Sequence, residues 1–180
     1  MSSTPQSGEP QKGRRDFLVL TGYTMGVAGL IGAGIPFVQS LQPAADTQAL
    51  ASIDVNLKAL VPGQAITVMW QGKPVFIRYR TPAEIERAKR DDDTALIDPE
   101  TDAQRFPLHP QWLVVIGICT HLGCVPLGQK ASDNHGDFEG WFCPCHGSHY
   151  DISARIRKGP APKNLVIPPH SIKDNLLTIG

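Results

Sequence analysis

The sequence has no excess of charge of either sign, and it has no cysteine outside one short segment. Lysine and arginine together number 17, as do aspartate and glutamate, so the formal net charge is zero. A balanced charge creates no field that would recruit nucleic acid, and we expect no nucleic-acid partner. All four cysteines lie between Cys119 and Cys145. This confinement excludes a disulfide framework spread over the chain and indicates one local site.

Charged residues are also absent from residues 17 to 45. A bilayer core needs ~20 apolar residues in a helix, and residues 17–41 meet that length, so we expect a single transmembrane anchor there. The alternative is a cleaved secretory signal, whose apolar region is ~7–15 residues. Residues 1–16 contain Lys12, Arg14 and Arg15, which the positive-inside rule keeps in the cytoplasm. The rest of the chain is then expected in the periplasm, anchored in the bacterial inner membrane.

The arginine pair has a second interpretation. Arg14-Arg15 resembles a twin-arginine export signal, which is the route for proteins that fold and take up a cofactor before export. Gly13 and Val19 depart from the residues that this motif prefers. The alternative is that the arginines only determine topology.

After the anchor, residues 42–51 carry small residues and no strong strand or membrane pattern, so we expect a flexible tether. Residues 52–180 form the soluble part. Short apolar runs between turn residues predict a small antiparallel β domain. The runs are 65–70, 74–79, 112–118, 137–142, 164–167 and 176–179. Residues 82–91 have strong helix formers after an initial proline and predict a helical insertion, followed by an irregular stretch to Pro110.

Two segments combine cysteine with histidine. They read Cys119-Thr-His121-Leu-Gly-Cys124 and Cys143-Pro-Cys145-His146-Gly-Ser148-His149-Tyr150. Apolar strands lead into both segments, so each is expected to be a loop at the end of a hairpin, and the two loops can present four ligands to a small metal cluster. A structural zinc site with two cysteines and two histidines is the alternative, but it leaves no reason for the other two cysteines.

The two segments resemble the cluster loops of high-potential Rieske proteins. Gly159-Pro160-Ala161-Pro162 and the charged insertion before Trp112 make the chain similar to the Rieske iron–sulfur subunits of bacterial quinol–cytochrome c reductases. The resemblance implies a mainly β chain, with one N-terminal transmembrane helix and a small antiparallel Rieske domain. That domain carries a helix-loop insertion and a two-loop cluster-binding subdomain at about residues 118–162. Ala154 departs from the family, in which a glycine is expected.

The resemblance also implies one [2Fe–2S] cluster and its ligands. Cys119 and Cys143 would bind one iron and His121 and His146 the other. Cys124 would form a disulfide with Cys145, which suits an oxidising periplasm. The neutral imidazoles reduce the negative charge of the cluster, and Rieske centres accordingly have potentials of ~−150 to +300 mV.

Further roles follow from the same resemblance. Ser148 would donate a hydrogen bond to a bridging sulfide and Tyr150 to the sulfur of Cys119. His146 would hydrogen-bond quinol and accept its proton, with His121 exposed beside it. Leu122 and Pro126 would either dock on cytochrome b or pack within their loop. The other four histidines lack ligand spacing and are expected on the surface: His109, His135, His149 and His170.

The implied function is electron transfer within a larger complex. The cluster would accept one electron with a proton from quinol and pass it to cytochrome c1, supporting proton translocation, with cytochromes b and c1 as partners. The subunit would not be catalytic alone, and its head would move on residues 42–51. One rival is the small Rieske subunit of another periplasmic oxidase, such as arsenite oxidase, although the insertion at residues 82–110 argues against it. A second rival is a membrane-tethered zinc module. A Rieske oxygenase would need a further catalytic domain.

Overall fold

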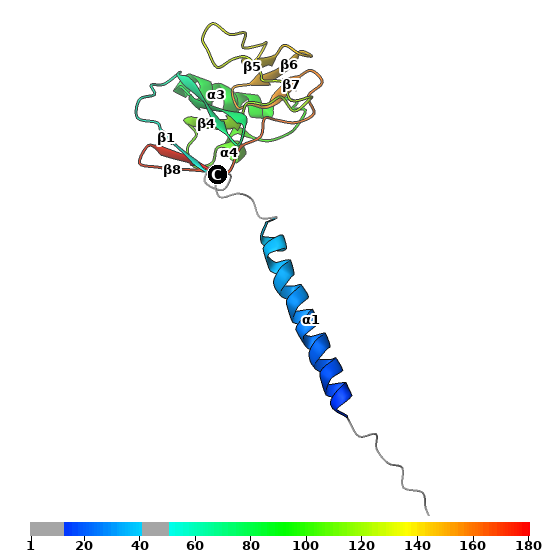
Figure 1. Cartoon of the computed structure of the whole chain (residues 1–180). Helices are drawn as coiled ribbons and strands as arrows, with labels where there is room; N and C mark the ends of the chain where they lie inside the picture. Colours follow the sequence, from blue (N-terminus) through cyan, green and yellow to red (C-terminus); the bar gives the residue numbers. More distant parts are fainter. Residues whose placement is uncertain (1–12, 41–50) are drawn as a thin grey trace, which may run out of the picture. The chain divides into compact units, whose positions relative to one another are not determined.

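The computed structural model describes residues 13–40 and 51–180 of the chain (Figure 1). The chain divides into two units, Met1–Ala45 and Asp46–Gly180. Residues 1–12 of the expected cytoplasmic tail lie outside the described residues, and so does the expected tether at 42–51 apart from Ala51.

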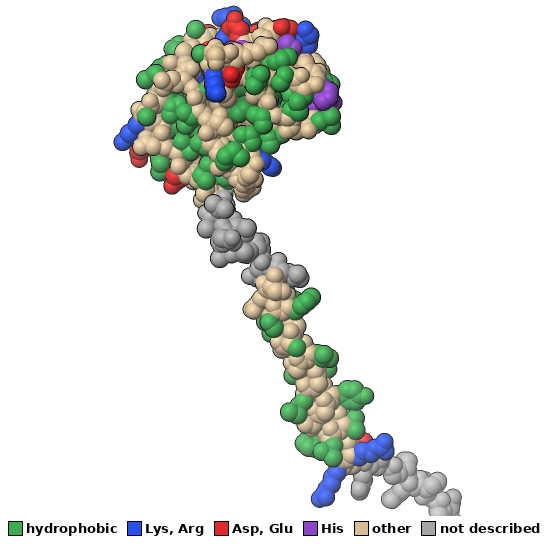
Figure 2. Space-filling view, turned by 45° about the horizontal axis from the view of Figure 1, so that its top comes forward, with side chains coloured by type: hydrophobic (Ala, Val, Ile, Leu, Met, Phe, Trp, Pro, Cys, Tyr) green, Lys and Arg blue, Asp and Glu red, His purple; other side chains and the backbone are tan. Residues whose placement is uncertain are grey.

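Helix α1 (Arg14–Gln39) forms the described part of the first unit. Its 26 residues extend over about 39 Å at 1.5 Å per residue, longer than a hydrocarbon core of about 30 Å. By length and composition it is a candidate membrane span. Hydrophobic side chains cover much of the face of the helix that Figure 2 shows, with the blue Lys and Arg side chains at its N-terminal end. Thr21 Oγ1 donates to the Phe17 carbonyl over 2.8 Å, so this hydroxyl is satisfied within the helix, as an apolar surrounding requires.

The second unit is built from short antiparallel strands, which confirms the predicted mainly β fold. Within residues 51–180, three sheets of three strands each are formed. The first sheet contains β1 (Ile53–Asn56), β9 (Leu176–Ile179) and β8 (His170–Lys173). The second contains β2 (Ala65–Trp70), β3 (Lys73–Tyr79) and β4 (Trp112–Ile116). The third contains β5 (Glu139–Cys143), β6 (Ser148–Asp151) and β7 (Ile156–Lys158), and lies at the end of the unit opposite the first sheet (Figure 1).

Two hairpins are closed by tight turns at the positions that the sequence indicates. Gln71 and Gly72, with φ of 50° and 72°, connect β2 to β3. Asp174 and Asn175, with φ of 49° and 65°, connect β8 to β9. Two consecutive residues with positive φ match the right-handed twist of the flanking strands.

The insertion between β3 and β4 contains the predicted helix. Helix α3 (Pro82–Arg90) begins with a capping box: the Glu84 amide donates to Thr81 Oγ1, and the Glu84 side chain accepts from the Thr81 amide. A 3₁₀ turn, η1 (Asp91–Asp93), follows directly. A short helix, α4 (Asp102–Arg105), has its own capping box and was not predicted from the sequence.

The expected strand at residues 164–167 is wrong, because this segment forms no ladder of its own. It connects β4 to the turn that contains Ala154 instead. The Leu165 amide donates to the Ala154 carbonyl over 2.9 Å, and the Val166 carbonyl accepts from the Ile116 amide over 2.7 Å. A short apolar run can be buried as a connecting segment as well as in a strand, so composition does not separate the two cases.

Buried side chains of residues 51–180 form two apolar clusters. One cluster includes Phe76, Trp141 and Tyr150 and also contains Cys119 and Cys143. The other fills the space around the first sheet and the facing side of the second. The two cysteines are therefore held by a packed core, although they begin surface loops.

Candidate metal centre

The two cysteine–histidine segments form loops of the same construction. The first follows β4, and the second connects β5 to β6. In the first loop the Gly123 amide donates to the Cys119 carbonyl over 3.0 Å, and in the second the Gly147 amide donates to the Cys143 carbonyl over 3.0 Å. Both glycines have positive φ, 87° and 73°, a conformation that glycine adopts without strain. Each loop therefore begins at a buried cysteine and turns back four residues later.

A disulfide between Cys124 and Cys145 links the loops, as the resemblance implied. The Cys119 amide also donates to the Cys124 carbonyl over 2.8 Å. The sulfur of Cys143 lies in one group with the disulfide sulfurs, all within 4.8 Å of one another. Because Cys124 and Cys145 are bonded to each other, Cys143 is the member of this group that retains a thiol.

Two thiols and two imidazoles remain for a metal. Cys119 and Cys143 are each 2% exposed and form no disulfide in the described part of the chain. Burial raises the pKa of the Cys143 thiol, and the adjacent Cys119 thiol raises it further, against hydrogen bonds from the amides of Cys145 and His146. The rings of His121 and His146 approach edge to face, with their centroids 4.6 Å apart.

One imidazole nitrogen tests whether a metal fits here. His121 Nδ1 is buried and has no hydrogen-bond partner among the described residues. A buried polar atom without a partner costs about 1–3 kcal/mol, a cost that a metal bond would remove. His146 is exposed. Two thiols with two imidazoles fit a [2Fe–2S] cluster with mixed ligation, and they also satisfy the ligand preferences of zinc.

Tyr150 contacts the first two residues of the first loop, Cys119 and Thr120. Its side chain is fully buried, and its hydroxyl donates to Cys119 Sγ over 3.3 Å and accepts from the Thr120 amide over 3.3 Å. Burial raises the pKa of Tyr150, and Cys119 raises it further. The phenol therefore keeps its proton at physiological pH and remains a hydrogen-bond donor.

Ser148 lies at the start of β6, directly after the second loop, and is buried. Its hydroxyl oxygen accepts from the Ala161 amide over 3.2 Å, which leaves the hydroxyl proton available. Ala161 belongs to the segment Gly159–Pro162, which packs on the second loop. A side chain at Gly159 would meet the Gly147 carbonyl at 2.4 Å, so this close approach requires glycine.

Thr120 was not singled out in the sequence, although it lies inside the first motif. Its Oγ1 donates to the Lys163 carbonyl over 2.6 Å and accepts from the Lys163 amide over 3.3 Å. Thr120 thus connects the first loop to the segment after Pro162. A threonine between Cys119 and His121 gave no signal of this contact, which joins residues 43 apart in the sequence.

From the sequence, the four other histidines are expected on the surface, and Leu122 and Pro126 either at a docking surface or packed within their loop. The surface position expected for His149 is wrong: its side chain is 12% exposed, and Nδ1 accepts from the Asp137 amide over 3.0 Å. His109, His135 and His170 are half-buried. Leu122 at the tip of the first loop is 71% exposed, whereas Pro126 is buried.

Comparison with known families resolves the choice between iron–sulfur and zinc. Residues 57–169, which include both loops and the insertion, match the family described as the Rieske [2Fe-2S] domain. The second unit is thus a Rieske-type iron–sulfur domain, and its cofactor is a [2Fe–2S] cluster. Residues 4–44 match the family described as the ubiquitinol-cytochrome C reductase Fe-S subunit TAT signal, which supports the twin-arginine interpretation of Arg14-Arg15.

Full-length relatives define the family more closely. The chain is 56% identical over 174 residues to the ubiquinol-cytochrome c reductase iron-sulfur subunit of Rhodospirillum rubrum, covering 97% of this chain and 93% of that protein. It is 52% identical to the subunit of the same name from Rickettsia felis, over the whole of both chains. The mitochondrial Rieske subunit of the cytochrome b-c1 complex of Saccharomyces cerevisiae is 50% identical, over 97% of this chain and 80% of that protein. The chain belongs to the family of Rieske iron–sulfur subunits of ubiquinol–cytochrome c reductase.

A solved structure agrees at the level of the fold. A chain of a structure titled "Hyperthermophilic respiratory Complex III" superimposes with a TM-score of 0.53 at 23% identity, covering 88% of this chain and 98% of that one. The family makes this chain a subunit of an oxidoreductase complex. The rival assignment to another periplasmic oxidase is not favoured, because the relatives named above carry the reductase name.

Proposed function

We propose that Cys119 and Cys143 ligate one iron of the cluster and that His121 and His146 ligate the other. When bound, the [2Fe–2S] cluster would supply a one-electron acceptor for quinol and an electron donor for cytochrome c1. His146 accepts the accompanying proton from quinol, and His121 lies beside it. The subunit supports proton translocation as part of the complex and is not catalytic alone.

The observation that carries this proposal is the buried Nδ1 of His121 without a hydrogen-bond partner in the described residues. A ring nitrogen that binds iron would be shielded from water in the same way as His121 Nδ1. The other ring nitrogen of a ligating histidine is then free to exchange a proton with a bound molecule. His146 is exposed and therefore accessible to a quinol.

Two side chains support the ligand loops with hydrogen bonds. Tyr150 donates to Cys119 Sγ, and Ser148 has a proton available for a bridging sulfide. Hydrogen bonds to sulfur favour the reduced and more negative state, so both residues raise the potential. They are expected to make the cluster a stronger oxidant of quinol.

We also propose how the chain is arranged at the membrane. Residues 1–16 lie in the cytoplasm, residues 17–41 span the inner membrane, and residues 52–180 lie in the periplasm with the cluster-binding subdomain at about 118–162. Residues 42–51 act as the tether on which the head moves between cytochrome b and cytochrome c1. The exposed Leu122 at the loop tip supports docking of this loop against cytochrome b.

Histidine variants test the ligand assignment. We expect that His121→Gln and His146→Gln each abolish the electron paramagnetic resonance signal of the reduced cluster in purified complex. His149→Gln is the matched control, because His149 lies three residues beyond His146 but bonds to the Asp137 amide. Loss of the signal in all three variants, or in none, would contradict the assignment. A quinol-site inhibitor should alter the signal of the wild type if His146 contacts quinol.

A further inference from the structure

The turn after Tyr150 is held by a buried carboxylate. Asp151 follows Tyr150 directly and is fully buried. Its Oδ1 accepts from the amides of Ser153, over 2.9 Å, and Arg155, over 3.0 Å, and its carbonyl accepts from the Ala154 amide over 2.8 Å. These three bonds fix the backbone at the end of β6, the strand that carries Tyr150.

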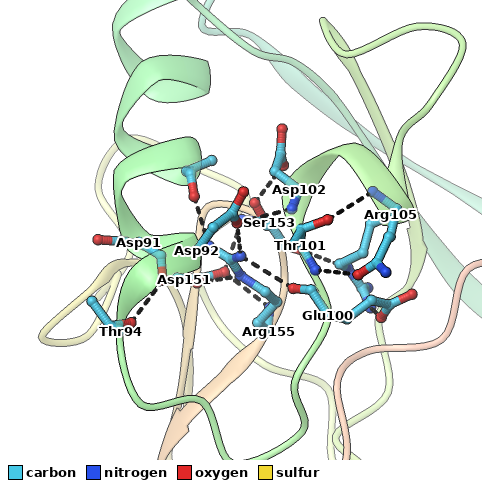
Figure 3. A network of polar contacts seen from close by, with 12 residues as sticks. Asp91, Asp92, Thr94, Glu100, Thr101, Asp102, Arg105, Asp151, Ser153 and Arg155 are labelled. Carbon is cyan, nitrogen blue, oxygen red and sulfur yellow. Dashed lines mark hydrogen bonds and ion pairs between the residues drawn. The ribbon is translucent and has the colours of Figure 1, made fainter.

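Arg155 connects this turn to the helical insertion, as Figure 3 shows. The guanidinium is fully buried and donates from Nε to Asp151 Oδ2 over 2.8 Å. It also donates to Asp92 Oδ1 of η1 and, over 2.9 Å, to the Ala88 carbonyl of α3. A fourth bond reaches the Glu100 carbonyl over 3.2 Å. One side chain thus joins the Tyr150 strand to three separate points of residues 88–100.

The insertion also contacts the same turn through its second helix. Ser153 Oγ donates to Asp102 Oδ1 over 2.5 Å, and Arg105 Nε donates to the Ser153 carbonyl over 2.7 Å. Asp102 in turn pairs with Arg80, the residue directly after β3. Helices α3 and α4 therefore both support the turn, and neither contacts the ligand loops through the bonds named here.

The charge of Arg155 is retained in this buried position. Burial alone would lower the pKa of Arg155, but the carboxylates of Asp151 and Asp92 outweigh it and raise that pKa above its usual value. A buried ion pair costs desolvation energy and is weak evidence for a stabilising role. The arrangement of four acceptors around one planar guanidinium indicates a role in positioning.

We propose that Arg155 is a positioning residue for the cluster: by joining the insertion to Asp151, it fixes the hydrogen bond from Tyr150 to Cys119. This inference rests on the proposed ligand role of Cys119. The Tyr150–Cys119 bond spans 3.3 Å from oxygen to sulfur, and a hydrogen bond weakens as its angle departs from linear, so a displacement of β6 that turns the hydroxyl away from the sulfur weakens it. The helical insertion, which is far from the ligands in sequence, would thereby influence the reduction potential.

Arg155→Lys tests the proposal because it keeps the charge but removes the fork of donors. A lysine cannot reach Asp151, Asp92 and both carbonyls at once. We expect the midpoint potential of the cluster in purified complex to fall, in the same direction as in Tyr150→Phe. In the Arg155→Lys, Tyr150→Phe double variant the two downward shifts should not add, because the second substitution removes the bond through which the first acts.

If Arg155 influenced the cluster only through its positive charge, Arg155→Lys would leave the potential unchanged, because lysine carries the same charge. If Arg155→Lys leaves the potential unchanged, or if its shift adds fully to that of Tyr150→Phe, the proposal is overturned. The matched control is Arg78→Lys, which alters a partly buried ion pair with Glu84 at the other end of α3 and should leave the potential unchanged. An equal shift in this control would indicate general loosening of the head and would also overturn the proposal.

Failure of this inference can be separated from failure of the proposed function. If Tyr150→Phe itself leaves the potential unchanged, the proposed bond to a ligand sulfur is wrong. If Tyr150→Phe lowers the potential and Arg155→Lys does not, only the role of Arg155 is wrong.

Should Arg155→Lys fail to fold, Asp92→Asn removes the carboxylate on the insertion side and leaves the Asp151 pair intact. It should lower the potential and accelerate hydrogen exchange of the Ser153 and Arg155 amides, and unchanged exchange would overturn the proposal.

Discussion

Tyr150 on β6 donates a hydrogen bond to Cys119 Sγ, at the start of the loop after β4, over 3.3 Å. The same hydroxyl accepts from the Thr120 amide. Tyr150 lies on the strand that follows the second cysteine–histidine loop, and it thus supports the first of these loops. Through this contact the position of Cys119 Sγ depends on the packing of the third sheet, to which β6 belongs.

Tyr150→Phe removes this bond and retains the buried ring. A hydrogen bond is worth on the order of 1 kcal/mol, so the midpoint potential should fall by about 40 mV for one electron. A redox titration followed by electron paramagnetic resonance measures the shift. Tyr79→Phe is the control, because Tyr79 stacks on Trp112 in the second sheet and should leave the potential unchanged. An unchanged potential in Tyr150→Phe would show that the bond does not affect the cluster.

The disulfide should contribute to stability as well as hold the loops together. Cys124 and Cys145 are 21 residues apart, and closing a loop of this length stabilises a fold by about 3 kcal/mol in the chain-entropy account. The double substitution Cys124→Ser, Cys145→Ser should lower the free energy of denaturant unfolding by this amount. Wild-type protein unfolded under reducing conditions should match the variant. Equal stability of the variant and the oxidised wild type would contradict this expectation.

Ala154 is buried and has a φ of 59°, a conformation that favours glycine. The conformation costs an alanine about 1–2 kcal/mol. Replacing it with glycine loses about 0.8 kcal/mol of methyl burial and about 0.4–1 kcal/mol through the freer unfolded chain. The terms nearly balance, so Ala154→Gly should change the unfolding free energy by less than about 1 kcal/mol. This balance accounts for alanine at a position where the resemblance led us to expect glycine.

A larger side chain at the same position should behave differently. Ala154→Val adds a β-branched group to a buried left-handed residue and should destabilise the protein by more than about 2 kcal/mol. Denaturant unfolding of both variants checks the pair of expectations. If valine were tolerated as well as glycine, the constraint inferred from the backbone would be wrong.

Glu84 should make stability depend on pH in the acid range. Burial raises the pKa of Glu84, but hydrogen bonds from the Thr81 amide and from Arg78 outweigh it and hold that pKa below its ordinary value of 4.5. The stabilisation is therefore complete above pH 4.5 and is lost as the pH falls through the lower, folded-state pKa. In Glu84→Gln this component of the acid destabilisation should be absent. Unfolding free energies from pH 6 to about pH 3 test this, and parallel curves for both proteins would contradict it.

Local sequence patterns predicted the β2–β3 and β8–β9 turns, helix α3 and the loop motifs. Each depends on residues close together in the chain: Gln71-Gly72, the Thr81–Glu84 box, and the paired cysteines and histidines. The role of Arg155 was not predictable in this way, because its partners Ala88 and Asp92 lie 67 and 63 residues away. The contacts of Thr120 and His149 were missed for the same reason. These arise from tertiary packing, and a single sequence does not display it.

The proposed ligation of the cluster uses two histidine nitrogens and two cysteine sulfurs. Pulsed electron paramagnetic resonance of the reduced complex, with ¹⁵N-labelled histidine incorporated, tests it most directly. We expect strong couplings to two histidine nitrogens. A spectrum without histidine couplings, as four sulfur ligands would produce, would contradict it.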